Sequence, residues 1–206
     1  MALLVLASTS AYRADLLARL ALPFTQQAPD YIEAPLATSA SGAPGNTLPE
    51  TPQATARRHA RGKCEAVDAP PPGAWTIGSD QVLSADDGTV LHKPGNFTNA
   101  LAQLDRCCGH WMTATTAIAL RRDDGVLHTA YETFSVRLRT LSAAQTRDYL
   151  DTDRPWDCAG SIRAEGHGIR LLAESVGRDV CTFYGLPLML LTDMLSAMGH
   201  PSLRSP

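Results

Sequence analysis

The chain has 206 residues, of which 44% are apolar and 19% charged, and its formal net charge at pH 7 is -3. This length suits one domain with a hydrophobic core, and the composition excludes a fibrous or wholly disordered protein. The apolar runs fall far short of the roughly 20 residues that span a bilayer, and the slight acidity disfavours binding to duplex nucleic acid. The N-terminus lacks the features of a signal peptide, and the five scattered cysteines are typical of reduced thiols. We therefore expect a cytoplasmic protein without membrane association.

The chain alternates between apolar runs typical of strands and periodic segments typical of helices, which indicates an α/β fold with a mixed sheet. The predicted strands cover residues 2–7, 24–32, 75–85, 113–121, 126–138 and 157–162. The predicted helices cover residues 11–20, 53–67, 98–106, 142–150 and 186–198. Helix N-caps are expected at Ser10, Thr51, Thr98 and Ser142. Residues 37–50 are rich in Ala, Ser, Gly and Pro and predict a flexible surface loop.

A polar segment, Ser8-Thr-Ser-Ala-Tyr-Arg13, follows directly after the first predicted strand. A helix that begins here leaves its first N–H groups without intrahelical partners, and the positive end of its dipole points outward. Ser8 and Arg13 would complete a site for an anion such as phosphate. Helix capping alone would also explain these residues, because Ser and Thr are common at strand-to-helix turns.

Three polar residues, Ser79-Asp80-Gln81, interrupt the apolar strand predicted over 75–85. Burial without partners would cost roughly 2–7 kcal/mol for each polar group, so we expect a special environment here. Asp80 would either cap a neighbouring segment or face a ligand at the end of the sheet, where it could bind a divalent metal or accept a proton from water. Glu33 is a second carboxylate, and the two together would suit Mg²⁺.

A further candidate site is the glycine-containing segment from Cys158 to Gly168, which includes Glu165. Glycine allows the backbone to approach a ligand closely, although an ordinary exposed loop would have the same composition.

The two lysines stand out because the other sixteen basic residues are arginines. Lys63 and Lys93 either persist by chance or mark places where a compact cation contacts a phosphate.

Six segments, taken in order, resemble the Maf family of nucleoside triphosphate pyrophosphatases, also called septum formation inhibitor proteins. They are LASTSAYR, IEAP, RGKCEAV, TIGSDQV, HKPG and CAGSIRAEGHGI, and the resemblance runs from Leu3 to about Leu195. It implies one domain over residues 1–206 with an inosine-triphosphatase-like fold. That fold has a mixed twisted sheet, flanking helices and an active-site cleft between two lobes.

The resemblance also implies a reaction, the hydrolysis of a nucleoside triphosphate to the monophosphate and diphosphate with Mg²⁺ or Mn²⁺ as cofactor. Asp80 would take the proton from the attacking water, and Glu33 would bind the metal together with Asp80. Catalysis would be mainly electrostatic. The groups expected on the triphosphate are Ser8, Arg13, Lys63 and Lys93. A homodimer is a further expectation.

Within the family, the segments favour the branch that hydrolyses 7-methyl-GTP over the branch that acts on dTTP and UTP. The branch pattern falls on Tyr12, Gln81 and Glu165. The cationic base would stack on Tyr12 and donate hydrogen bonds to Glu165, with Gln81 helping to position it. The family usually has Trp where Tyr12 stands, so we expect weaker selectivity for the methylated base.

Two other functions stay compatible with the sequence. One is the same reaction on pyrimidine or other modified purine triphosphates. The other is a nucleotide-binding regulator of cell division with little turnover, which the retained charged positions disfavour.

Overall fold

The computed structural model describes residues 3–34 and 50–201, so nearly all of the loop predicted at 37–50 lies outside the described residues. The described strands are β1 (Leu4–Ala7), β2 (Phe24–Gln27), β3 (Trp75–Ala85), β4 (Trp111–Arg121), β5 (Leu127–Leu138) and β6 (Leu172–Gly177). The described α-helices are α1 (Ala11–Ala18), α2 (Pro52–Glu65), α3 (Phe97–Cys107), α4 (Ala143–Asp153) and α5 (Leu188–Ala197). Three 3-10 helices are η1 (Ala159–Ser161), η2 (His167–Leu171) and η3 (Val180–Thr182).

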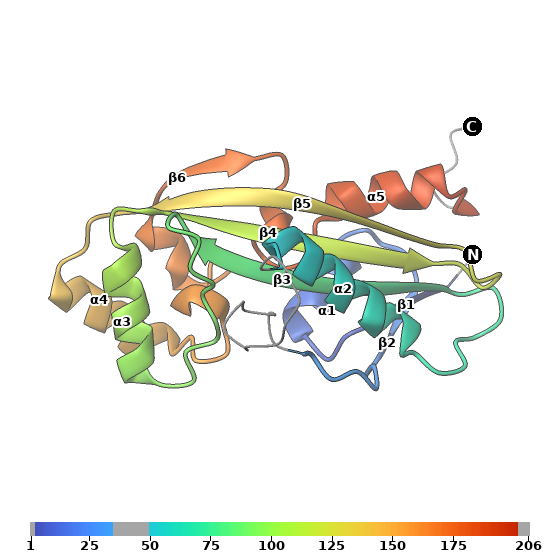
Figure 1. The fold of residues 1–206 in the computed structure, drawn as a ribbon, viewed down its shortest axis with the longest axis horizontal. Coiled ribbons are helices and arrows are strands. Elements are labelled where there is room, and N and C mark those ends of the chain that lie inside the picture. Colours follow the sequence, from blue (N-terminus) through green and yellow to red (C-terminus); the bar gives the residue numbers. More distant parts are fainter. Residues whose placement is uncertain (1–2, 35–49, 202–206) are drawn as a thin grey trace, which may run out of the picture. The chain divides into compact units, whose positions relative to one another are not determined.

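The described strands form one six-stranded sheet in the order β2-β1-β3-β4-β5-β6 (Figure 1). β1 is parallel to both of its neighbours and pairs Leu4 with Phe24 of β2 and with Trp75 of β3. β5 and β6 are antiparallel, with Ser135 opposite Val176. The sheet is therefore mixed and carries flanking helices, which confirms the predicted fold class. No helix within the described residues has the length and apolar character needed to cross a membrane.

The chain divides into two compact units. Unit 1 comprises residues 1–81, 116–132 and 185–206, and unit 2 comprises residues 82–115 and 133–184. A large hydrophobic cluster fills unit 2, with side chains from its strand segments, α3 and α4. Its fully buried members include Leu104, Met112, Leu138, Tyr149 and Leu150.

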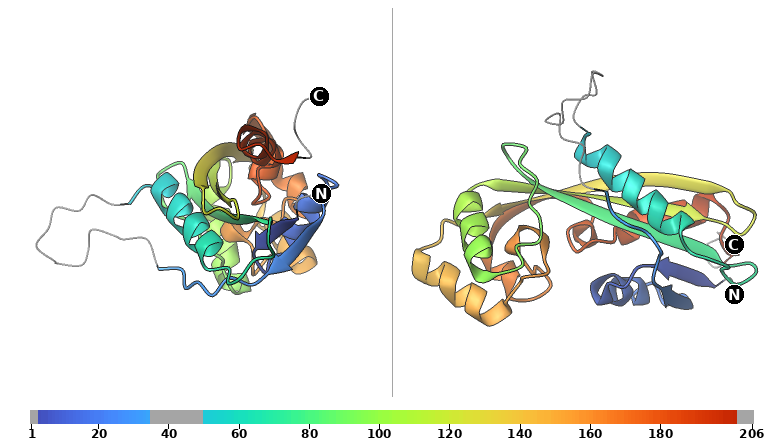
Figure 2. Two further views of the ribbon diagram at one scale, coloured as in Figure 1. Left: turned by 90° about the vertical axis from the view of Figure 1, so that its right-hand side faces the viewer. Right: turned by 60° about the horizontal axis from the view of Figure 1, so that its bottom comes forward.

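In unit 1, α2 lies along β3 (Figures 1 and 2). The contact is close because β3 carries a glycine there: a Cβ at Gly78 would stand 2.1 Å from the carbonyl oxygen of Ala60 and 2.8 Å from Cβ of Cys64. Side chains two residues apart on a strand point to the same face. Asp80 therefore faces α2, as Gly78 does, and Ser79 faces the other way.

Three of the four predicted N-caps are confirmed. The side chains of Ser10, Thr51 and Ser142 each accept a hydrogen bond from the backbone N–H three residues later, and Ser142 is part of a capping box. The prediction of Thr98 as the N-cap of α3 is wrong. Asn96 is the N-cap, and its Oδ1 accepts from the N–H of Asn99 at 2.9 Å.

The strand predicted over 157–162 is wrong. This segment forms η1 instead, because Gly160 and Ser161 adopt positive φ angles of 66° and 61°, which a strand does not allow. The strand β6 was not predicted. It lies at the edge of the sheet and most of its residues are exposed, so it lacks the apolar alternation of a half-buried strand.

The packing of α2 on β3 generates a stability prediction. We expect Gly78→Ala to lower the free energy of unfolding by about 3 kcal/mol, because the new methyl group would meet backbone atoms that cannot rotate away. The control is Gly88→Ala, where φ is 82° and nothing lies within 4 Å, so that only the left-handed backbone cost of about 1 kcal/mol applies. Urea unfolding measures both. Equal losses in the two variants would contradict the close approach of α2 and β3.

Candidate functional site

Lys63 of α2 forms ion pairs with two carboxylates. Its Nζ lies 2.6 Å from Oδ1 of Asp80 on β3 and 2.5 Å from Oε1 of Glu33. The side chains of Lys63 and Asp80 are each 10% exposed, whereas that of Glu33 is 57% exposed. A buried ammonium group is costly unless it is paired and hydrogen-bonded. The two carboxylates satisfy this need, and the more exposed Glu33 leaves the cluster accessible on one side.

The position of Lys63 follows from the buried face of α2. Ala56, Ala60 and Lys63 recur at helical spacing and are all buried. The two alanines are small, and Gly78 on the facing strand has no side chain, so the helix backbone lies near the strand. This brings the stem of Lys63 against β3 and its ammonium group to Asp80.

Glu33 belongs to a segment without regular structure, which Tyr31 fastens to α2. The Tyr31 hydroxyl is 2.9 Å from Nδ1 of His59, and the two rings pack edge to face. The Tyr31 ring also covers Gly62, where a Cβ would stand 2.1 Å from its Cε2 atom. A larger residue at position 62 would thus displace Tyr31 and, with it, Glu33.

The charges around Glu33 shift its pKa. Burial by itself would raise the pKa of Glu33, but the hydrogen bond and charge of Lys63, followed by the charges of His59 and Arg13, hold it below its usual range. Glu33 is therefore ionised at neutral pH and contributes a full negative charge to the cluster.

Arg13 of α1 is held by the loop before α5. Its Nε donates to the carbonyl oxygen of Gly185 at 3.0 Å, and the Ser79 hydroxyl donates to the same oxygen at 3.0 Å. Burial lowers the pKa of Arg13, while the charges of Asp80 and Glu33 act in the opposite direction. The guanidinium group consequently lies within electrostatic reach of both acids and stays charged, as arginine does in proteins.

Ser8 closes the turn that leads into α1. Its buried Oγ accepts from the N–H of Ser10 at 3.1 Å, and Ser10 in turn caps the helix by accepting from the N–H of Arg13 at 3.3 Å. A serine hydroxyl that accepts can still donate its own proton. The start of α1 therefore combines backbone N–H groups, the Ser8 hydroxyl and the positive end of the helix dipole. Arg13 lies in the same first turn.

Tyr12 and Gln81, the predicted neighbours of the base, also belong to unit 1. Tyr12 is half-buried in the first turn of α1. Gln81 is half-buried and is the last residue of β3 that belongs to unit 1, and its Nε2 donates to Oγ1 of Thr116 on β4 at 3.0 Å. This bond fixes the direction of the Gln81 side chain.

The two remaining predicted residues, Lys93 and Glu165, belong to unit 2. Lys93 is exposed in the loop before α3, next to the buried Pro94, whose carbonyl oxygen accepts from Nδ2 of Asn99 at 2.9 Å. Glu165 is exposed between η1 and η2. The pKa of Glu165 is raised, mainly by partial desolvation of its carboxyl group. A hydrogen bond from its own backbone N–H and the charge of Arg163 act in the opposite direction, and the charges of Asp157 and Asp153 add to the increase.

The structure thus brings Arg13, Glu33, Lys63 and Asp80 into one charged cluster within unit 1, with Ser8 in the turn before Arg13. The carboxylate oxygens of Glu33 and Asp80 contact the same ammonium group, so they lie close enough together to share a cation. Two carboxylates, completed by water and substrate oxygens, are a typical donor set for Mg²⁺. Within the described residues no group of three His, Cys, Asp or Glu side chains could hold a metal. The donor set fits a metal that arrives with a phosphate ligand, and it does not fit an all-protein structural site.

Several residues that shape the site were not predicted as part of it. Tyr31 and His59 place Glu33, and the Gly185 carbonyl group orients Arg13 and Ser79. The sequence does indicate that Ser79 has a hydrogen-bond partner, because a buried hydroxyl in an apolar strand needs one. Nothing in the sequence indicates the role of Gly185, since that role depends on contact with residues more than a hundred positions away.

Known proteins match this chain over most of its length. The family model described as Maf-like protein matches residues 3–198. The chain belongs to the Maf family. A 7-methyl-GTP pyrophosphatase of Pseudomonas syringae pv. tomato is 41% identical over 197 residues, which cover 95% of this chain and 96% of the relative. A protein with the same description from Nitrosococcus oceani is 40% identical over 97% of this chain and 95% of its own length. The Ham1 protein of Staphylococcus aureus is a more distant likeness, with a TM-score of 0.41 and 12% identity over 67% of this chain and 72% of that one.

The ion pairs of Lys63 generate a second stability prediction. Lys63→Met would leave Asp80 buried without its partner, and we expect a loss of about 3 kcal/mol in the free energy of unfolding. The matched control is Arg61→Met, which removes an exposed i,i+4 pair with Glu65 from the same helix and should cost about 0.2–1 kcal/mol.

The cause of the loss can be tested by a second substitution. Asp80→Asn in the Lys63→Met background removes the unpaired charge and should recover part of the lost stability, as measured by urea unfolding. No recovery would show that the loss does not come from an unpaired charge on Asp80.

Proposed function

We propose that this member of the Maf family hydrolyses 7-methyl-GTP to 7-methyl-GMP and diphosphate, with a divalent cation as cofactor. The substrate is supported by relatives of that name at about 40% identity over nearly the full chain. The reaction class is supported by one structural observation above others, the Lys63 ammonium group held between Asp80 and Glu33. A cytoplasmic location and a homodimer are also part of the proposal and rest on the sequence.

The charged cluster suits the cleavage of a phosphoanhydride. The bond between the α- and β-phosphates lies among several negative charges, and more charge develops on the bridging oxygen as the bond breaks. Arg13, Lys63 and Lys93 are the groups proposed to stabilise this charge. Ser8 and the N-terminus of α1 would hold the terminal phosphates.

Asp80 is the proposed general base. Its Oδ1 is engaged with Lys63, which fixes the orientation of the carboxylate and leaves Oδ2 to accept the proton of the attacking water. Lys63 would thus have two tasks, orienting the base and neutralising charge on the substrate.

Glu33 and Asp80 would hold the cation together with phosphate oxygens of the substrate. When bound, Mg²⁺ or Mn²⁺ would neutralise charge on the triphosphate and polarise the bond that breaks. In its absence Lys63 supplies the positive charge between the two carboxylates, which keeps both acids in place for the arriving cation.

Recognition of the base is assigned to Tyr12, Gln81 and Glu165. Methylation at N7 gives the guanine ring a positive charge while its N1–H and N2–H₂ groups stay donors. An aromatic face attracts a cationic ring by about 0.5–2 kcal/mol, and a carboxylate forms stronger hydrogen bonds with charged donors than with neutral ones.

We expect Asp80→Asn to lower kcat by about 100-fold or more, which is the usual contribution of a general base. The fold should be retained, because an amide oxygen can still accept from Lys63. The control is Asp68→Asn, an exposed acid in the loop before β3, which should leave kcat unchanged. Release of diphosphate from 7-methyl-GTP measures both, with circular dichroism as the test of folding. Near-normal turnover by Asp80→Asn would remove Asp80 from the mechanism.

The reaction class and substrate are tested by a panel of triphosphates that includes 7-methyl-GTP, GTP, dTTP, UTP and ITP. We expect diphosphate release with Mg²⁺, no release with EDTA, and the highest kcat/KM for 7-methyl-GTP. A maximum for a pyrimidine or deaminated purine would assign another substrate to the same chemistry. Binding without any release would favour a nucleotide-binding regulator.

Glu165→Gln tests the recognition of the base. The ratio of kcat/KM for 7-methyl-GTP to that for GTP should fall by about tenfold, the loss expected for one charge-assisted hydrogen bond. Glu174→Gln is the control, because Glu174 is an exposed acid on β6 that pairs with Arg137. An unchanged ratio in Glu165→Gln would show that Glu165 does not contact the base.

A further inference from the structure

Asp153 is a buried acid at the last position of α4, where both burial and the helix dipole disfavour a negative charge. Its side chain is only 4% exposed. A carboxylate at the C-terminal end of a helix is disfavoured by the helix dipole, and a buried carboxylate is costly without strong partners. Both of its oxygens are used: Oδ2 accepts from the backbone N–H of His167 at 3.0 Å, and Oδ1 contacts Nδ1 of the His167 ring.

Tyr149 makes a similar contact one helical turn earlier on α4. Its buried hydroxyl accepts from the backbone N–H of Arg163 at 2.9 Å and donates to the carbonyl oxygen of Ser161 at 3.2 Å. Because Tyr149 and Asp153 are four residues apart, they lie on the same face of α4. One face of this helix therefore binds the backbone of the following segment at residues 163 and 167.

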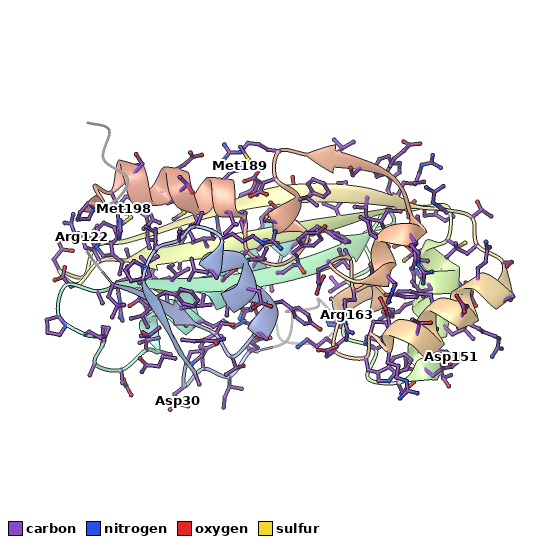
Figure 3. All side chains as sticks on the ribbon, turned by 180° about the vertical axis from the view of Figure 1, so that it is seen from behind. Asp30, Arg122, Asp151, Arg163, Met189 and Met198 are labelled. Carbon is purple, nitrogen blue, oxygen red and sulfur yellow. The ribbon has the colours of Figure 1, made fainter. Side chains whose placement is uncertain are left out.

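Glu165 lies midway between these two anchored positions, in a tightly closed turn. The N–H groups of Gly166 and Gly168 both donate to the carbonyl oxygen of Arg163, at 3.1 and 3.0 Å. A Cβ at Gly168 would stand 2.5 Å from that oxygen, so the turn closes only with glycine at this position. Figure 3 labels Arg163, the first residue of this turn, and Asp151 on α4.

We propose that Asp153, assisted by Tyr149, is a positioning residue that fixes the turn of residues 163–168 and thereby sets the direction of the Glu165 carboxylate for recognition of the methylated base. The inference rests on the proposed function, since it assigns to Glu165 the role described above. The charge of Asp153 is among the causes that raise the pKa of Glu165, so the two acids interact electrostatically. A carboxylate on a mobile loop would lose conformational entropy on binding the base, and a fixed turn avoids this cost.

The test compares kcat and KM for 7-methyl-GTP and GTP in a set of α4 variants. Asp153→Ala removes both acceptors, and we expect it to lower the ratio of kcat/KM for the two substrates by about tenfold, as Glu165→Gln does, mainly through KM for 7-methyl-GTP. Asp153→Asn keeps a carbonyl acceptor for the His167 N–H, so its ratio of kcat/KM for the two substrates should stay close to that of the wild type. Asp151→Asn makes the same change in charge at an exposed position of the same helix and should behave as wild type.

Two further measurements separate positioning from loss of fold. Amide hydrogen exchange in residues 163–168 should become faster in Asp153→Ala, with the exchange of β3 unchanged. The double variant Asp153→Ala/Glu165→Gln should be no less selective than either single variant, because both substitutions remove the same interaction. If Asp153→Ala does not fold, Tyr149→Phe replaces it. That variant loses the acceptor for the Arg163 N–H and should show the same direction of change.

These measurements distinguish a failure of the positioning role of Asp153 from a failure of the proposed function of Glu165. If Glu165→Gln lowers the ratio and the folded Asp153 or Tyr149 variants do not, the positioning role is wrong and the proposed function stands. Additive losses in the double variant would likewise overturn the positioning role. If Glu165→Gln leaves the ratio unchanged, the role of Glu165 and the inference built on it both fail.

Discussion

The contact of one ammonium group with two carboxylates is the interaction on which the rest of the site depends. Lys63 can reach Asp80 only because α2 lies close to β3, and Gly78 is the residue that allows this distance. Glu33 reaches the same ammonium group because Tyr31 packs over Gly62. Two glycines, which contribute no side chain of their own, thus determine where the charges of three other residues lie. The surrounding structure holds these charges in place before any substrate binds, which is the usual basis of electrostatic catalysis.

The two units differ in what they contribute. In unit 1 three charged groups of the site lie on regular elements, where packing fixes them: Lys63 on α2, Asp80 on β3 and Arg13 on α1. Glu33 is the exception, and Tyr31 holds its segment against α2. In unit 2 both candidate residues, Lys93 and Glu165, lie on loops. Loops vary more easily than strands and helices. Lys93 and Glu165 therefore lie on segments that tolerate sequence change more readily than α1, α2 and β3 do.

The sequence predicted those features that depend on local patterns. The strand over 75–85 is predicted with its observed bounds, because a proline cluster at 70–72 precedes it and the turn residues 86–88 follow it directly. The edge strand β6 and the turn at Gly160 were missed, since the first is polar and exposed and the second depends on positive φ angles. The residues of the charged cluster were named from motifs, but their contacts were not. Contact between Lys63 and Glu33 depends on the packing of Tyr31 against His59 and Gly62, which holds the segment of Glu33 against α2.

The central claim is that the charged cluster around Lys63 cleaves the bond between the α- and β-phosphates of 7-methyl-GTP. Phosphorus-31 NMR of the reaction in the presence of Mg²⁺ identifies the broken bond directly from its products. We predict the simultaneous appearance of 7-methyl-GMP and diphosphate in equal amounts, and formation of both products by Asp80→Asn at a rate lower by about 100-fold or more. Orthophosphate with 7-methyl-GDP as the first products would contradict the claim, as would an unchanged spectrum of 7-methyl-GTP.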